Sequence, residues 1–146
     1  MELQGLSATD VVKLLDMQLH PEGGHYIETF RDGDNDNRGA CSSIYYLLAA
    51  GGVSAWHRVI DTAEIWHWYG GARLALSTAA PEGPSHTIEL GNDLGAGQRP
   101  QAAIPANHWQ MAISRGAWTL VGCTVSPAFE FKYWELAPEG WAPEAS

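Results

Sequence analysis

The chain has 146 residues, and its hydrophobic fraction of 45% is sufficient for the core of one domain over residues 1–146. Its formal net charge of −9 argues against a nucleic-acid partner, because Lys and Arg must neutralise phosphates, and no basic run favours an anionic membrane surface. The sequence shows neither a signal peptide nor an apolar stretch near the length of about 18 residues that a membrane span needs, so a cytoplasmic protein is expected.

One helix is predicted near the N-terminus, over about residues 7–17. Ser7 is a suitable N-cap, and Val11 and Leu14 lie at helical spacing behind it. Pro21 and the pair Gly23-Gly24 then break the helical pattern. Short apolar or alternating segments follow, separated by Gly, Pro, Asn and Asp, and predict strands at about residues 25–30, 40–50, 55–60, 64–71, 72–78, 86–90, 102–104, 108–112 and 118–125.

A last aromatic segment, 129–134, precedes a Pro- and Gly-rich tail over 137–146. Many short strands with a single helix indicate an all-β sandwich or barrel, with the barrel over about 24–136 and no linker to a second domain. Cys41 and Cys123 lie in strand-like runs, and they are expected to be buried reduced thiols.

The stretch 55–71 is the most informative part of the chain. Apolar and polar residues roughly alternate on both sides of a short polar break at 61–63, which predicts two strands joined by a tight turn. Two such strands would bring His57 and Glu64 near one another. The pair could form a metal site, an acid/base pair, or a satisfied polar spot in the core.

The spacing of Gly51, His57, Glu64 and Gly71 resembles the first motif of the cupins, and residues 105–110 approximate the second. Further blocks fall in the same order and make the chain similar to the cupin-5 family (DUF985) over about residues 15–136: Leu15-Asp16-Met17 with Pro21-Glu22-Gly23-Gly24, Ile44 to Leu48, Trp56-His57-Arg58, Glu64 to His67, Trp109-Gln110, and Gly122 to Phe131. The resemblance implies a double-stranded β-helix of the jelly-roll class, an N-terminal helix and a homodimer. It implies no particular reaction.

Metal-binding cupins take two histidines and a glutamate from the first motif and a third histidine from the second. Here His57 and Glu64 are present, but Val59 and Gln110 occupy the other two positions. Val offers no donor and Gln is a poor replacement for imidazole. We therefore expect no metal cofactor, and a divalent metal held by His57, Glu64 and Gln110 is kept as the alternative.

Strand alternation predicts which side chains share the barrel interior. If Glu64 points inward, Trp66 and Trp68 do as well and His67 points outward, and if Gln110 points inward, His108 shares its face. An apolar interior with a few polar groups is typical of a small-molecule pocket, so a small polar metabolite is the expected ligand. The predicted ligand-binding residues are Tyr45, Arg58, Trp66, Trp68, His108 and Gln110.

The sequence leaves more than one possible role for several other side chains. Tyr45 or Tyr46 is a candidate acid, and the candidates for holding an anionic group are Arg58 and Arg73. Glu22 and Arg31 flank the Gly23-Gly24 turn, where they either close a rim or pair at the surface.

Three functions remain open from the sequence. The first is a metal-independent cupin in which His57 is a general base oriented by Glu64, with isomerase- or epimerase-type proton transfer. The second is a metal-dependent cupin enzyme, a dioxygenase or isomerase, that uses His57, Glu64 and Gln110. The third is a non-catalytic ligand-binding or sensing module.

Overall fold

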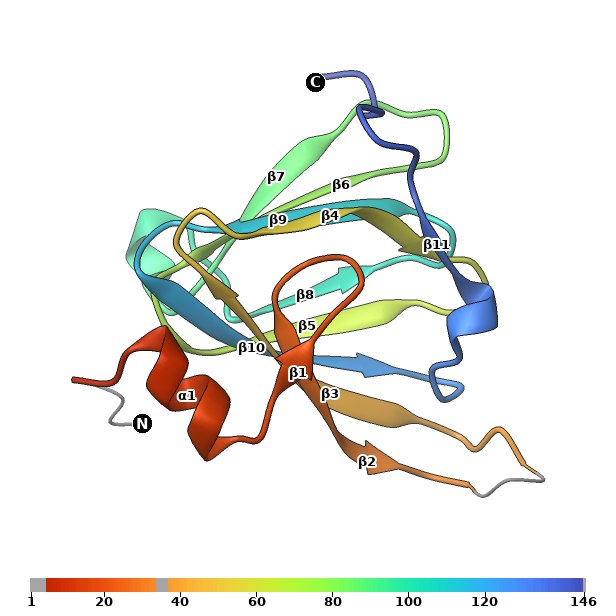
Figure 1. Cartoon of the computed structure of the whole chain (residues 1–146). Coiled ribbons are helices and arrows are strands. Elements are labelled where there is room, and N and C mark those ends of the chain that lie inside the picture. Colours follow the sequence, from red (N-terminus) through yellow and green to blue (C-terminus); the bar gives the residue numbers. More distant parts are fainter. Residues whose placement is uncertain (1–4, 34–36, 146) are drawn as a thin grey trace.

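The computed structural model describes residues 5–33 and 37–145, which form two antiparallel sheets with one short helix at the side (Figure 1). The larger sheet has the strand order β1-β2-β3-β10-β5-β8, and the smaller one has the order β11-β4-β9-β6-β7. This arrangement confirms the predicted all-β jelly-roll fold with its N-terminal helix.

The elements in chain order are α1 (Ala8–Leu14), β1 (Gln18–Leu19), β2 (His25–Arg31), β3 (Ser42–Ala49), β4 (Val53–Val59), β5 (Glu64–Gly71), β6 (Leu74–Ala79), β7 (His86–Leu90), the 3-10 helix η1 (Leu94–Ala96), β8 (Gln101–Ile104), β9 (Trp109–Ser114), β10 (Trp118–Val125), the 3-10 helix η2 (Phe131–Tyr133) and β11 (Trp134–Leu136). The predicted strands correspond to β2 through β10. The two-residue strand β1 carries too little pattern to be recognised in the sequence.

Helix α1 begins where the sequence predicts and ends earlier. The side chains of Ser7 and Asp10 each accept a hydrogen bond from the other's backbone N–H, which is a capping box. Asp16 has a φ of +54°, so the chain leaves the right-handed helical region before residue 17. Val11 anchors the helix on the larger sheet, in a cluster with Leu47 and Trp118.

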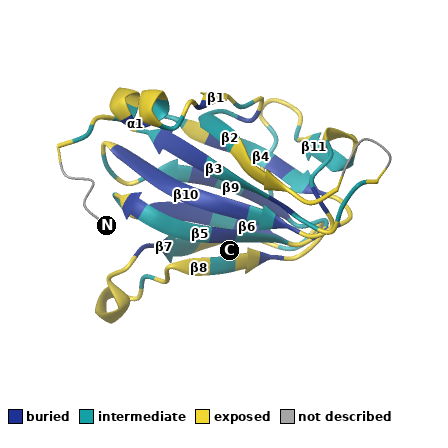
Figure 2. Ribbon diagram, turned by 90° about the horizontal axis from the view of Figure 1, so that it is seen from below, coloured by how far each residue is buried: buried dark blue, intermediate teal, exposed yellow. Residues whose placement is uncertain are grey.

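The main core lies between the two sheets. The central strand β10 of the larger sheet is almost entirely buried, its neighbours β3 and β5 are mostly buried or partly buried, and β2 and β8 have most of the exposed positions (Figure 2). Tyr46, Trp66 and Cys123 from these middle strands pack with Leu76 and Ala112 of the smaller sheet. Cys41 and Cys123 are both free, and Cys123 is buried whereas Cys41 is only partly so.

The segment after β10 closes one end of the barrel. It forms η2 and then β11, which pairs with β4 so that Trp134 lies opposite Val59 and Leu136 lies opposite His57. Within residues 5–33 and 37–145, no helix is long and apolar enough to cross a membrane.

Candidate functional site

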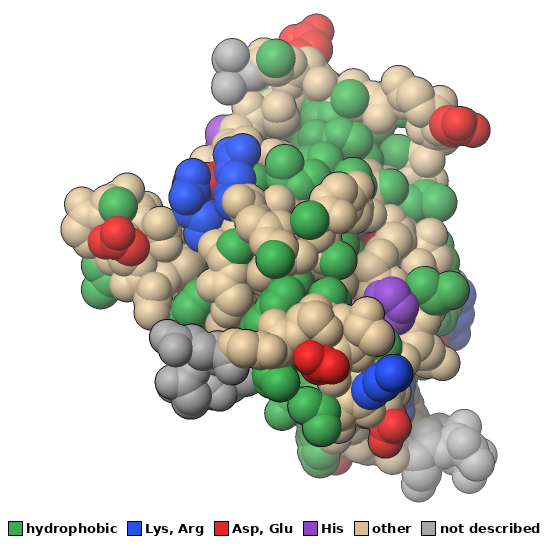
Figure 3. Space-filling view, turned by 60° about the vertical axis from the view of Figure 1, so that its left-hand side comes forward, with side chains coloured by type: hydrophobic (Ala, Val, Ile, Leu, Met, Phe, Trp, Pro, Cys, Tyr) green, Lys and Arg blue, Asp and Glu red, His purple; other side chains and the backbone are tan. Residues whose placement is uncertain are grey.

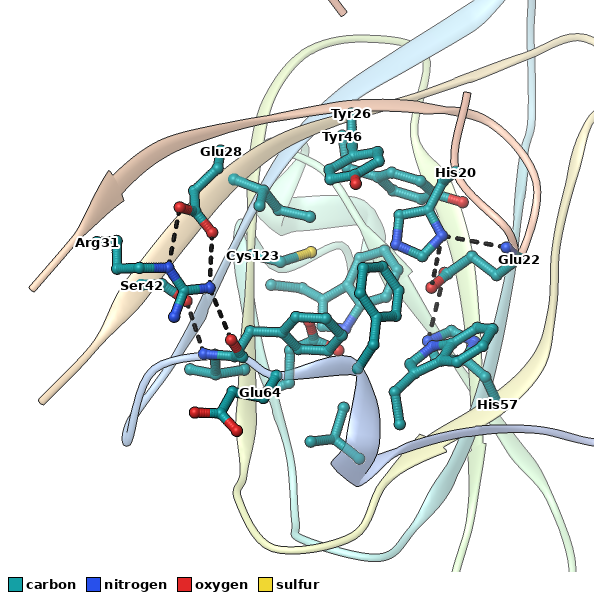
Figure 4. Close-up of a pocket in the computed structure, with 18 of the residues that line it drawn as sticks. His20, Glu22, Tyr26, Glu28, Arg31, Ser42, Tyr46, His57, Glu64 and Cys123 are labelled. Carbon is teal, nitrogen blue, oxygen red and sulfur yellow. Dashed lines mark hydrogen bonds and ion pairs between the residues drawn. The ribbon is translucent and has the colours of Figure 1, made fainter. Parts of the chain in front are cut away.

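A cavity of about 540 Å³ lies at the end of the barrel that carries β11. Figure 4 shows His20, Glu22 and His57 at one end of this cavity and Glu28 and Arg31 at the other. The complete lining is Gln18, His20, Glu22, Tyr26, Glu28, Arg31, Ser42, Ile44, Tyr46, His57, Val59, Glu64, Trp66, Cys123, Val125, Phe129, Glu130, Phe131 and Trp134. Of the predicted site residues, His57, Glu64 and Trp66 therefore meet in one cavity.

His57 projects from β4 and is held in one tautomer. Its Nδ1 lies 2.7 Å from the backbone oxygen of Ala55, and since a carbonyl can only accept, Nδ1 carries a proton. In the neutral ring Nε2 is then unprotonated, and it lies 3.3 Å from Oε2 of Glu22. One proton shared between this nitrogen and the Glu22 carboxyl group makes the contact favourable. The sequence predicted Glu64 as the orienting carboxylate, but the structure places Glu22 in contact with His57 instead.

Glu22 reaches this position from the turn between β1 and β2. Tyr46 donates a hydrogen bond of 2.5 Å to the backbone oxygen of Gly23, which fixes that turn over the cavity. The Ser54 hydroxyl donates to Oε2 of Glu22. A register shift between Ser54 and His57 in β4 allows both side chains to face the same carboxyl group although they are three residues apart.

His20 borders Glu22 on the other side. Its Nδ1 accepts a hydrogen bond of 3.1 Å from the backbone N–H of Glu22 and lies 3.3 Å from Oε1 of the same residue. The ring packs edge-on against Tyr26, with centroids 4.6 Å apart. Burial, with a smaller contribution from His57, lowers the pKa of His20 from 6.5 to about 4, so this imidazole is neutral near pH 7.

Glu64 is oriented by a chain of hydrogen bonds. The indole N–H of Trp66 donates to Oε1 of Gln110 at 2.8 Å, and Nε2 of Gln110 donates to Oε1 of Glu64 at 2.7 Å. Because an indole nitrogen only donates, Trp66 fixes which end of the Gln110 amide faces Glu64. Gln110 is itself buried behind the cavity wall, so it positions Glu64 and does not line the cavity.

Burial shifts the protonation of the whole cluster. It raises the pKa of Glu22 from 4.5 to about 7, opposed by hydrogen bonds from Ser54. It also raises the pKa of Glu64 from 4.5 to about 7, with His57 opposing and Glu22 reinforcing the shift. Burial lowers the pKa of His57, although Glu64 acts in the other direction. The cluster therefore exchanges protons near neutral pH, which suits acid/base chemistry.

Besides Gln110, four predicted ligand-binding residues lie outside the cavity, and their expected placement is corrected here. Tyr45 points to the opposite face of β3 and packs under α1, because its neighbour Tyr46 takes the inner face. Trp68 shares the inner face of Trp66 but lies farther along β5, away from the cavity, where its indole N–H donates to the backbone oxygen of Ala72. His108 belongs to the turn before β9, where Asn107 has a φ of +66° and strand alternation does not apply.

Arg58 is the fourth of these residues, and the candidate Arg73 also lies away from the cavity. Arg58 donates to Glu135 at 2.8 Å and lies over the ring of Trp109. Arg73 pairs with Glu89 at 2.9 Å. On the face that Figure 3 draws, Lys and Arg side chains form small separate groups. His67 points outward, as strand alternation predicts, and its Nδ1 lies 3.4 Å from the side-chain nitrogen of Gln101 on β8.

The sequence analysis left several cavity residues without an assigned role. Glu22 was considered only for a rim or a surface pair, and His20, Tyr26, Phe131 and Trp134 were not considered for the site. A signal for the last two existed: they lie in or beside the block Gly122 to Phe131, on which the family resemblance partly rests. Arg31 does lie at the cavity rim, where it pairs with Glu28 at 2.9 Å.

The residues present do not fit the metal site of metal-binding cupins. Val59 offers no donor, and both ends of the Gln110 amide are engaged by Trp66 and Glu64. Among the described residues, no group of three or more His, Cys, Asp and Glu side chains has an arrangement that could hold a metal ion. The four-ligand set is therefore reduced to His57 and Glu64.

Comparison with solved structures finds proteins of similar architecture. A structure from Shewanella oneidensis is 38% identical, with a TM-score of 0.85, and the match covers 90% of this chain and 85% of the other. A hypothetical protein from Leishmania major is 25% identical, with a TM-score of 0.82 and coverages of 90% and 88%. A dTDP sugar isomerase from Desulfovibrio desulfuricans is 14% identical, with a TM-score of 0.61 and coverages of 85% and 82%, which shows a shared fold alone.

A search of curated protein sequences gives no match. The family model described as "Cupin superfamily (DUF985)" matches residues 9–137, nearly the whole chain. With the jelly-roll barrel and the inward-facing His57 and Glu64, this match shows that the chain belongs to the DUF985 family of the cupin superfamily.

Proposed function

We propose that this protein is a metal-independent cupin enzyme that moves a proton on a small polar carbonyl compound, in the manner of an isomerase or epimerase. The contact between Nε2 of His57 and the Glu22 carboxyl group, inside a cavity of about 540 Å³, carries the proposal. This contact puts the base beside a carboxyl group that can stabilise its protonated form, in a cavity of the size that a small molecule needs.

His57 is the base in this proposal. Because Nδ1 is held by Ala55, only Nε2 can take a proton from the carbon beside the substrate carbonyl. The C–H electron pair then moves toward the carbonyl oxygen and forms an enolate. The reactive molecules are those in which Glu22 has lost its proton, since Nε2 is then free, and the Glu22 carboxylate, 3.3 Å from Nε2, stabilises the imidazolium that results.

Glu64 is the acid. With a pKa raised to about 7, a substantial fraction of its carboxyl groups is protonated at neutral pH and can protonate the enolate oxygen. In an isomerisation, His57 returns its proton to the neighbouring carbon and the ionised Glu64 takes the proton of the hydroxyl group on the carbon that becomes the new carbonyl, so the carbonyl group moves by one carbon. In an epimerisation, the enediol turns over before His57 returns its proton to the same carbon, because one base reaches only one face, and Glu64 takes back the proton of the enol. No oxidant or reductant enters either balance.

Exchange with solvent deuterium tests the proposal. The protein is incubated in D₂O with free aldoses, ketoses and dihydroxyacetone, and deuterium at the carbon beside the carbonyl is followed by NMR. We expect enzyme-dependent incorporation, which His57→Gln lowers by about 10²- to 10⁴-fold, the range for loss of an acid/base group. The matched control is His67→Gln on the outer face of β5.

Absence of exchange with every compound, or equal exchange by the wild type and His57→Gln, would contradict the proposed proton transfer. Ligand binding without any exchange would instead indicate a non-catalytic binding or sensing module. The two outcomes are separated by measuring binding and deuterium incorporation on the same samples.

A further inference from the structure

We propose that Arg31 is a second binding point of this cavity, where Nη1 donates a hydrogen bond to a hydroxyl or carbonyl oxygen at the far end of an uncharged polyhydroxy carbonyl compound. This ligand class rests on the proposed function, because the carbonyl group of the ligand is taken to lie at His57. The position of Arg31 and its free donor do not depend on that function.

A β-bulge in β2 turns Arg31 toward the cavity. Tyr26 and Glu28 line the cavity from β2, two residues apart, so regular alternation would make Phe30 the next inward residue. The register of β2 against β3 shifts between Glu28 and Phe30, and Phe30 is 55% exposed. Arg31 instead lies opposite Ser42, which also lines the cavity. Bulges often re-aim a side chain in this way beside active sites.

Most of the guanidinium group of Arg31 is already engaged. Nε and Nη2 donate to the two carboxylate oxygens of Glu28, at 3.0 and 2.9 Å, and Nη2 also donates to the backbone oxygen of Phe129 at 2.7 Å (Figure 4). None of these bonds uses Nη1, which has no partner among the described residues. The side chain is 34% exposed, so it is accessible to a ligand. Arg31 is therefore held in place with one donor nitrogen left over.

The free nitrogen suits a single uncharged oxygen better than a phosphate or carboxylate. A guanidinium group binds those anions best through two parallel N–H···O bonds from one edge. Glu28 occupies the edge formed by Nε and Nη2, and the Phe129 oxygen takes the remaining hydrogen of Nη2, so no complete edge is free. Glu28 also balances the charge of Arg31, which is the one Lys or Arg among the described lining residues.

The contribution of Arg31 should depend on the length of the ligand. Figure 4 shows His57 and Arg31 at opposite ends of the cavity, so a ligand that contacts both must extend along it. The cavity offers apolar surface from Ile44 and Trp66 to a carbon chain, and the carboxyl group of Glu64 can accept a hydrogen bond from a hydroxyl group. A polyhydroxylated chain matches this mixture of apolar and polar surface.

Uncharged ketoses of increasing length test this inference. The probes are dihydroxyacetone, erythrulose, xylulose and fructose, and the proteins are the wild type, Arg31→Met and Arg115→Met. Met keeps the apolar stem and removes the guanidinium group, and the control Arg115 pairs with Glu89 away from the cavity. Binding is followed by NMR of ¹⁵N-arginine-labelled protein, in which loss of a signal in Arg31→Met identifies Nε of Arg31. Deuterium exchange is measured on the same samples.

We expect the Arg31 signal to shift and the longer ketoses to bind the wild type at least about tenfold more tightly than dihydroxyacetone. Arg31→Met should weaken the longer ketoses by about tenfold, as for one lost hydrogen bond, and leave dihydroxyacetone unchanged. Equal weakening of all probes would show a structural role alone and overturn the inference. Absence of binding, or of a shift of the wild-type Arg31 signal, with every ketose also overturns it, even if the variant does not fold. Length-dependent binding without deuterium exchange would support the role of Arg31 while refuting proton transfer.

A matched phosphate provides a second, independent test. Fructose 6-phosphate should bind the wild type at least about tenfold more weakly than fructose, because no complete guanidinium edge is free for it. Glu28→Gln leaves the charge of Arg31 unbalanced, so this preference should fall by about tenfold. The control is Glu82→Gln, which removes an exposed carboxylate from the turn after β6. Tighter binding of the phosphate by the wild type, or an unchanged preference in Glu28→Gln, would overturn the uncharged ligand class.

Discussion

Replacing Gln110 by Leu tests the hydrogen-bond chain that positions Glu64. Gln110 and Trp66 are each 1% exposed, so water cannot replace the lost amide at the indole N–H. That unsatisfied donor costs roughly 1–3 kcal/mol, and the carboxyl oxygen of Glu64 loses a hydrogen bond of about 1 kcal/mol. We expect Gln110→Leu to lower the free energy of unfolding by about 2–4 kcal/mol, or the Tm by on the order of 10 °C.

The assay is urea unfolding followed by far-UV circular dichroism, with Gln101→Leu as the control. Gln101 is an exposed glutamine on β8, where the same substitution should change stability by no more than about 0.5 kcal/mol. Adding Trp66→Phe to Gln110→Leu removes the stranded indole N–H, so the double variant should lose less than the two single variants together. Equal stability of Gln110→Leu and Gln101→Leu would refute the reasoning.

Three further predictions follow from the site. The pKa of Glu22 is raised from 4.5 to about 7 in the folded protein, so its stabilising contribution is fully present below pH 4.5 and is lost as the pH rises to about 7. Urea titrations between pH 4.5 and about 7 should show the free energy of unfolding of the wild type falling by up to roughly 3 kcal/mol more than that of Glu22→Gln. If the two proteins lose stability in parallel as the pH rises, the raised pKa of Glu22 is contradicted. Gly23→Ala should lower the Tm far more than Gly51→Ala. Both glycines have positive φ, but only at Gly23 would an added Cβ meet the backbone, 2.0 Å from the oxygen of Val53. Equal losses of Tm in the two variants would argue against a crowded turn at Gly23. Elemental analysis of protein purified without chelator should find less than one equivalent of any transition metal, and a full equivalent that disappears in His57→Ala would overturn the metal-free proposal.

The two strands at the centre of the site were predictable because their sequences alternate, although β4 and β5 lie in different sheets and do not pair with each other. His57 and Glu64 were placed inside by motif spacing, and Trp66 was placed beside them by the period of two along a strand. In β3 the same logic fails between Tyr45 and Tyr46, because a strand packed on both faces has apolar residues at consecutive positions. Nothing local in the sequence tells which tyrosine faces the cavity.

The residues brought in by irregular segments were the least predictable. Glu22 lies in a turn whose glycines have positive φ, and its path over the barrel depends on the Tyr46 contact with Gly23. Trp134 reaches the cavity only because η2 redirects the chain before β11 pairs with β4. Both placements depend on contacts between parts of the chain that are far apart in sequence.

The pairing of β11 with β4 also governs when a ligand can influence folding during synthesis. The segment that carries Phe131 and Trp134 is translated after the strands β1 to β10, so an emerging chain can form both sheets while one wall of the cavity is still missing. A ligand stabilises by mass action only a state that binds it. Such a ligand would therefore stabilise the barrel that contains β11 and give no stabilisation to a barrel that still lacks it.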